Sequence, residues 1–157
     1  PKTASPALET LADAALHTED PRIRFAVLMR ALSPALDQHA RLKAVQQLCT
    51  RYRLPNEYRQ LAELIIELEA GIRSDQPQIR LVQLEHADAF RNPQRWSLLL
   101  AAYQACGLLD TQQVERWQID FEQVRSVQSG PLLEQGFKGK RLGEEIRRQR
   151  LLKLSRP

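Results

Sequence analysis

Lysines and arginines gather near the end of this chain, in the run GFKGKRLGEEIRRQR at 136–150. Residues 137–157 hold eight Lys/Arg and two Glu, a net charge of +6, whereas the whole chain has a net charge of +4. The other 136 residues are therefore slightly acidic, with a net charge of −2. Concentrated positive charge on a near-neutral chain favours the docking of a polyanion. The candidate phosphate-binding residues are Lys138, Lys140, Arg141, Arg147, Arg148 and Arg150.

Glycines on both sides of Phe137 strengthen this interpretation, because a helix is predicted to follow them. The first N–H groups of a helix have no acceptor within it, so they and the neighbouring ammonium groups can meet one phosphate together. Such contacts position a nucleic-acid backbone without reading its sequence. The alternative is a solvated helix with internal ion pairs, in which Glu144 pairs with Arg147 or Arg148.

A second, weaker basic cluster is Arg-Asn-Pro-Gln-Arg at 91–95, and it adds Arg91 and Arg95 to the candidate phosphate-binding residues. The alternative interpretation is a helix capped by Asn92 with two exposed arginines. Trp96 and Trp117 recur at the spacing of core residues, as does Phe121. We therefore expect these aromatic side chains to pack in a core rather than to stack on bases.

No set of residues forms a recognisable catalytic or metal centre. His17, His39 and His86 are far apart, and Cys49 and Cys106 are isolated in apolar helical stretches. The cysteines are expected to be buried, reduced thiols. No glycine-rich phosphate loop or nucleophile elbow is present in the sequence. We predict that this chain contributes no catalytic residue and no metal ligand.

The elements that must position the basic residues are helices throughout. Helix-start signals recur along the chain, no segment alternates convincingly, and no Asn-Gly or Asp-Gly turn occurs. The predicted fold class is all-α, a multi-helix body with a smaller basic helical tail. The helical body is assigned to 1–128 and the basic tail to 129–157, or the two form one continuous domain. Helices are expected to start near Ser5-Pro6, Asp20-Pro21, Ser33-Pro34, Pro55, Pro77, Asn92-Pro93 and Asp110-Thr111.

Three local expectations can be checked against the structure. The apolar stripe of the helix that follows Pro55 continues to Ile72. Gly130-Pro131 is expected to break the helical pattern and to be followed by a short turn. No apolar run approaches the roughly 20 residues that span a bilayer, and no signal peptide is recognisable, so we expect a cytoplasmic protein. The missing initiator Met suggests a fragment of a longer chain.

Five stretches, in this order, resemble the C-terminal half of bacterial CCA-adding tRNA nucleotidyltransferases. The similarity runs from about residue 22 to residue 154. The stretches are RFAVL at 24–28, VQQLC at 45–49, RLPNEY at 53–58, RNPQR at 91–95, and GFKG at 136–139 with Glu144 and Glu145 after it.

The resemblance implies a helical body and tail that hold the tRNA acceptor arm by shape and phosphate contacts. Lys138, Lys140 and Arg141 match the family's tail segment. In the family an N-terminal head, absent from these 157 residues, uses Mg²⁺ with ATP and CTP to add CMP and AMP to the tRNA 3′ end. The fragment by itself is then expected to be inactive.

The sequence departs from the family at one position. Several bacterial members carry a histidine-aspartate metal motif after the Phe-Ala-Val-Leu stretch and act as phosphohydrolases, whereas this chain has Met29-Arg30-Ala31-Leu32 there. Arginine and alanine do not ligate a divalent metal, so phosphohydrolase activity is expected to be absent. The other alternative is a helical protein-interaction module that binds no nucleic acid.

Overall fold

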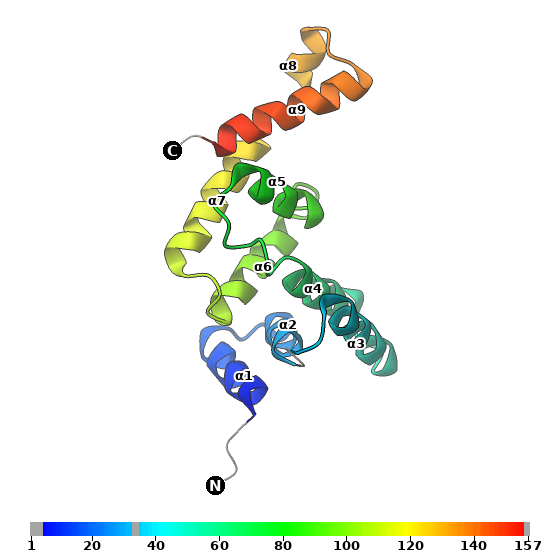
Figure 1. Cartoon of the computed structure of the whole chain (residues 1–157), viewed down its shortest axis with the longest axis vertical. Helices are drawn as coiled ribbons and strands as arrows, with labels where there is room; N and C mark the ends of the chain where they lie inside the picture. Colours follow the sequence, from blue (N-terminus) through cyan, green and yellow to red (C-terminus); the bar gives the residue numbers. More distant parts are fainter. Residues whose placement is uncertain (1–4, 33–34, 156–157) are drawn as a thin grey trace.

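The computed structural model describes residues 5–32 and 35–155, and within them it confirms the predicted all-α class, with nine helices and no strand (Figure 1). The chain forms an elongated stack of helices, with α1 at one end and the pair α8 and α9 at the other. The helices are α1 (Pro6–His17), α2 (Pro21–Ala31), α3 (Gln38–Arg51), α4 (Asn56–Glu67), α5 (Pro77–His86), α6 (Pro93–Ala105), α7 (Thr111–Arg125), α8 (Ser129–Glu134) and α9 (Gly139–Leu154).

One hydrophobic core joins the helices α2 to α7 and α9. Helix α2 packs on α1, α4 and α6, and α9 packs on α5, α7 and α8. The core extends from Ile23 in α2 to Leu154 at the end of α9, both almost fully buried. The last turn of α9 is therefore anchored in the same core as α2 to α7. The proposed boundary between 128 and 129 falls between α7 and α8 and stays a prediction.

Aspartates at the helix starts explain why several helices begin where the sequence predicted. Asp20 accepts a hydrogen bond from the Arg22 amide at 2.9 Å and begins α2. Asp110 and Gln113 form a reciprocal capping box at the start of α7. Each satisfies backbone N–H groups that lack a partner inside the helix. The start expected at Ser33-Pro34 lies outside the described residues, and α3 begins at Gln38 after its N-cap Asp37.

The prediction that α4 continues to Ile72 is wrong, because the helix ends at Glu67. Leu68 and Ile72 are still buried, but they lie in the turns that follow. Gly71 sits in these turns close to the side chain of Gln83, whose Nε2 would be only 2.4 Å from a Cβ at position 71. The apolar spacing thus reported burial correctly but not the end of the helix, and the close approach of Gln83 explains why position 71 is a glycine.

The short turn expected after Gly130-Pro131 is also wrong, because residues 129–134 form the helix α8. Proline is compatible with the first turn of a helix, where its missing N–H group would have no partner. The bend from α8 into α9 instead uses Gly136 and Gly139, which adopt φ values of +95° and +54°. These left-handed conformations suit glycine, and they turn the chain back so that α8 packs on α9.

The aromatic residues pack in the core, as expected. Trp96 and Trp117 are almost fully buried and meet edge to face with 5.2 Å between ring centroids. Phe121 is also buried. The three aromatic rings are therefore not accessible for stacking on a base.

The two cysteines differ in burial. Cys49 is buried and Cys106 is half-buried, and both thiols are reduced, so the expected burial is wrong for Cys106 alone.

The buried Tyr103 gives the first testable prediction. Its hydroxyl donates a hydrogen bond to the Ile65 carbonyl at 2.7 Å, and burial raises its pKa far above the usual value near 10. Above pH 10 the unfolded chain ionises this tyrosine while the folded chain does not. Stability is therefore expected to fall by about 1.4 kcal/mol per pH unit there. Urea titrations should show that Tyr103→Phe removes this slope of the unfolding free energy against pH. The contradicting result would be a folded chain whose three tyrosines all ionise together near pH 10, as followed by tyrosinate absorbance.

Candidate nucleic-acid interface

The tip of the basic tail is the start of α9. Lys138 is the N-cap residue, with an extended backbone at φ −142° and ψ 153°, and no side chain caps the helix. No acidic residue occupies the first turn of α9. The amide groups of this turn therefore keep their hydrogen-bonding capacity and the partial positive charge of a helix N-terminus. An anion can approach them without displacing a carboxylate.

Three basic side chains surround this helix start, and we call them the outer basic group: Lys138, Lys140 and Arg141. All three are exposed. The Lys140 side chain is 90% exposed, and its ammonium lies 3.8 Å from the Glu144 carboxylate, a distance typical of a weak surface pair. Lys138 and Arg141 make no ion pair with any residue in 5–32 or 35–155. The outer basic group is thus available to phosphate.

Two other predicted residues of α9, Arg147 and Arg150, face the body instead. The Arg147 guanidinium pairs with Glu85 of α5. The Arg150 guanidinium lies over the ring of Phe90, 4.5 Å from its centroid, and burial lowers the pKa of Arg150. Cation–π contacts of this kind stabilise packing more when they are desolvated. These two arginines attach α9 to the body.

Arg148 is exposed but paired. Its guanidinium donates a hydrogen bond to the carboxylate of Glu145, one helical turn earlier, at 2.6 Å. This hydrogen bond lowers the pKa of Glu145. The internal ion pairs of the alternative therefore occur within α9, but Glu144 pairs with Lys140 and the prediction that it pairs with Arg147 or Arg148 is wrong. The physical reason is that Arg147 reaches a carboxylate 62 residues away on α5, which the local sequence could not indicate.

The second basic cluster lies at the start of α6. The Arg91 side chain is 86% exposed, and its closest carboxylate is Asp88 at 3.9 Å. Arg95 is half-buried and donates a hydrogen bond to the Ala87 carbonyl at 3.0 Å. Asn92 occupies the N-cap position without a side-chain cap bond and instead donates to Asp88 at 3.2 Å. The alternative of a helix capped by Asn92 with two exposed arginines is thus correct for the N-cap position and for Arg91, and wrong for Arg95, while the Asn92 side chain makes no cap hydrogen bond.

This cluster borders a groove between α2, α4 and α6, which we call the central groove, with a volume of about 380 Å³. Sequence reasoning missed Arg22, which enters the groove from α2. Its guanidinium forms salt bridges with the carboxylates of Asp20 at 2.7 Å and Glu57 at 3.2 Å. No local signal connects Arg22 with residues 69 positions later. The groove is lined by Arg22, Glu57, Gln60, Leu61, Arg91, Asn92, Pro93, Gln94, Arg95 and Leu98.

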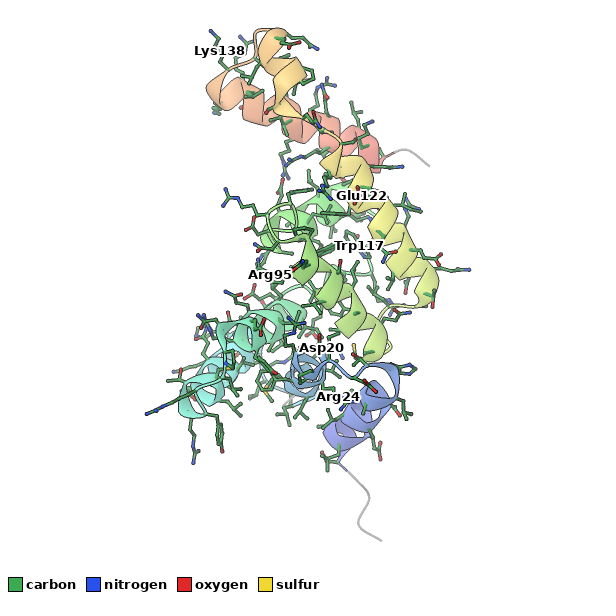
Figure 2. All side chains as sticks on the ribbon, turned by 180° about the vertical axis from the view of Figure 1, so that it is seen from behind. Asp20, Arg24, Arg95, Trp117, Glu122 and Lys138 are labelled. Atoms are coloured by element: carbon green, nitrogen blue, oxygen red, sulfur yellow. The ribbon has the colours of Figure 1, made fainter. Side chains whose placement is uncertain are left out.

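The structure does not bring the two basic clusters together. Figure 2 places Lys138 at the far end of the molecule and Arg95 near the middle of its length. They are separated along the long axis by α5 and the body-facing part of α9. A ligand that contacts both must therefore be long.

Within the described residues, no group of three or more His, Cys, Asp or Glu side chains could hold a metal ion. His86 pairs with Glu67 instead. The described helices are also too short or too polar for any of them to cross a membrane.

The sequence matches CCA-adding proteins over nearly its whole length. It is 34% identical over 151 positions to a CCA-adding enzyme of Pseudomonas putida, covering 92% of this chain and 39% of that protein. It is 30% identical over 165 positions to a multifunctional CCA protein of Pseudomonas savastanoi pv. phaseolicola, covering 92% and 40%. A multifunctional CCA protein of Vibrio vulnificus is 32% identical over 123 positions, covering 72% and 30%.

No family model matches the chain, and no solved structure matches it. The likeness rests on these curated relatives, several of which agree over the same large share of the chain. The chain spans about two fifths of the length of the first of them. Over that part of their length, this chain is a homologue of the CCA-adding proteins.

Proposed function

We propose that this chain is a cytoplasmic tRNA-binding unit that positions the acceptor arm of tRNA for 3′-end CMP and AMP addition by a nucleotidyltransferase head. The single observation that carries the proposal is the outer basic group, exposed around an uncapped helix start at the tip of the molecule. The homology to CCA-adding proteins supports the choice of tRNA as the polyanion.

The chemistry of the tip suits an RNA backbone rather than a particular base. Two ammonium groups, one guanidinium and the first amides of α9 supply hydrogen-bond donors and positive charge, which phosphate oxygens accept. No aromatic residue lines the central groove, and the ring beside Lys138 at the tip, that of Phe137, is half-buried, so phosphate contacts are the main ones that both places offer. Contacts of this type fix position and orientation without reading sequence. Such binding suits a protein that must accept many tRNA species.

The separation of the two clusters suggests how the RNA would lie. Arg95 at the central groove and Lys138 at the tip are far apart along the long axis (Figure 2), so one extended, rigid ligand could touch both. A double-stranded RNA arm has that shape, and it is recognised mostly through its backbone and shape. Arg147 and Arg150 would then act indirectly, by holding α9 in place.

In this proposal the bond-forming chemistry belongs to the head. Mg²⁺, ATP and CTP would bind there, because the described residues of this chain contain no cluster of metal ligands. The chain studied by itself should bind tRNA without adding nucleotides to it. The resulting division of labour places substrate positioning in the helical unit and catalysis in the head.

The test is a filter-binding titration with a tRNA transcript that lacks its 3′ CCA. Changing Lys138, Lys140 and Arg141 together to Gln should weaken binding by about 10- to 100-fold at low salt. The slope of log affinity against log salt should fall by about two to three, because each lost phosphate contact removes close to one unit.

A matched control removes three exposed positive charges elsewhere, by changing Lys43, Arg51 and Arg73 to Gln. This variant has the same net charge as the tail variant but should keep most of the affinity and of the salt slope. Equal losses in both variants would show that only overall charge matters. Absence of any salt-sensitive tRNA binding by the unaltered chain would sink the proposal.

One observation favours the alternative function, a protein-interaction module. Leu8 and Leu16 of α1 are 57% and 83% exposed and lie two turns apart on the helix, so they share one face. They leave apolar surface on α1 that a protein partner could cover. If the chain fails to bind tRNA, this face of α1 is where a protein partner should be mapped.

A further inference from the structure

A hollow of about 250 Å³ lies where α1, α2 and α3 meet the turn after α4, and we call it the arginine hollow. Arg30 of α2, Arg41 of α3 and Glu69 bring their charged groups to it. The three side chains are 25%, 10% and 25% exposed, so water reaches them only in part. The remaining lining residues, Pro6, Thr10 and Ala31, carry no charge. The hollow therefore has a net charge of +1.

One carboxylate is shared between the two guanidinium groups. Arg41 pairs with one oxygen of Glu69 through Nη1 and donates to the Arg30 carbonyl through Nη2 at 2.8 Å. The Arg30 Nε lies 3.0 Å from the other oxygen of Glu69, in a geometry that makes no hydrogen bond. The Arg41 Nε is buried without a hydrogen-bond partner in the described part of the chain, whereas the Arg30 Nε keeps its ion-pair contact with Glu69. The two guanidinium groups therefore share one carboxylate, and their remaining positive charge has no counter-charge among the residues that line the hollow.

The position of this hollow rules out one occupant. Arg30 and Ala31 stand where the resembling phosphohydrolases carry their metal-binding histidine and aspartate. Guanidinium groups are permanently protonated and offer no lone pair to a metal. The hollow has only one carboxylate, and both of its oxygens are engaged by arginine. A divalent metal ion therefore does not fit the residues present.

We propose that the arginine hollow binds a phosphate group, without hydrolysing it. Two partly desolvated guanidinium groups with one carboxylate between them leave one positive charge uncompensated, and an oxyanion would neutralise it. Arginine is suited to this because its planar N–H groups match phosphate oxygens in pairs. Arg30 is the residue that would make the first contact, since it is the more exposed of the two.

The proposal concerns the phosphate group, which either the free ion or a nucleotide monophosphate can supply. Isothermal titration calorimetry of the whole chain with sodium phosphate, and separately with CMP, distinguishes these sources. Binding of both with similar affinity assigns recognition to the phosphate alone, whereas binding of CMP only extends the site to the nucleoside. Ionic strength is held constant with NaCl, because phosphate also stabilises proteins by exclusion from their surface.

Arg30→Gln should weaken phosphate binding by about tenfold or more, since it removes a charge-assisted contact while preserving most of the side-chain volume. Lys43→Gln is the matched control, because it removes one exposed positive charge from α3 outside the hollow. Its phosphate affinity should not change. Circular dichroism at 222 nm verifies that both variants keep their helices.

Three results would overturn the proposal. They are no heat of binding with either phosphate or CMP, equal affinity in the wild type and in Arg30→Gln, or stoichiometric binding of Mn²⁺ that Arg30→Gln leaves unchanged. None of these outcomes involves tRNA affinity, so the phosphate site and the proposed tRNA-binding function fail or stand separately.

Discussion

Replacing Asp120 by alanine is expected to lower the free energy of unfolding by about 3–5 kcal/mol. Asp120 on α7 and Arg80 on α5 form an ion pair in the core, and their side chains are only 4% and 5% exposed. The nearest Arg80 nitrogens lie 2.7 Å from the carboxylate. Removing the carboxylate leaves a guanidinium buried without its counter-charge, which costs more than the ion pair itself contributes.

The surroundings of Arg80 explain why it cannot escape this penalty. Its guanidinium lies over the ring of Trp117, 3.5 Å from the ring centroid, and one nitrogen donates to the Ser74 carbonyl at 3.1 Å. Burial lowers the pKa of Arg80, which shows that its charged form already lacks solvation. Even so, an arginine does not lose its proton at accessible pH, so the unpaired charge remains.

Urea denaturation followed at 222 nm measures this prediction. Arg116→Ala is the control, because Arg116 also contacts Asp120, at 3.2 Å, but its side chain is 51% exposed. It should cost less than about 1 kcal/mol, as exposed ion pairs do. A loss below about 1 kcal/mol for Asp120→Ala would mean that Arg80 finds other solvation and that the buried pair has no structural importance.

Replacing Phe90 by alanine is expected to cost about 3 kcal/mol and to loosen α9 from the body. Phe90 lies between two partners, stacked on Phe121 of α7 with 5.8 Å between ring centroids and covered on α9 by Arg150. The ring is therefore a layer between the body and the tail. Without the ring Arg150 loses its cation–π contact. The salt bridge from Arg147 to Glu85 then still connects α9 with α5.

Two measurements separate loosening of the tail from general destabilisation. Limited proteolysis should cut near residues 126–139 faster in Phe90→Ala, whereas Phe90→Leu, which keeps most of the apolar volume, should behave more like the wild type. If the proposed function holds, tRNA affinity should also drop by several-fold at a temperature where the body is folded, because an unanchored α9 must be ordered on binding. Unchanged proteolysis would contradict a role for Phe90 in docking the tail.

The sequence by itself predicted most of the helices, though not α8, and it predicted that Trp96, Trp117 and Phe121 are buried. Asp20, Asp110 and the prolines that follow helix caps are local signals, because capping satisfies backbone groups within a few residues. The positive charge of residues 137–157 was likewise visible, since net charge needs no coordinates. Even the wrong extension of α4 to Ile72 identified buried residues correctly, because apolar spacing reports burial more directly than it reports helix ends.

Only the tertiary structure decided which of those charges are available. Lys138 and Arg147 are nine residues apart in one basic run, yet one is exposed at the tip and the other pairs with Glu85 on α5. The same holds for Arg30 and Arg41, whose shared carboxylate comes from a distant turn. Ion pairs and cation–π contacts depend on distances of a few ångströms between side chains. Chain folding sets those distances across tens of residues, and no local pattern in the sequence records them.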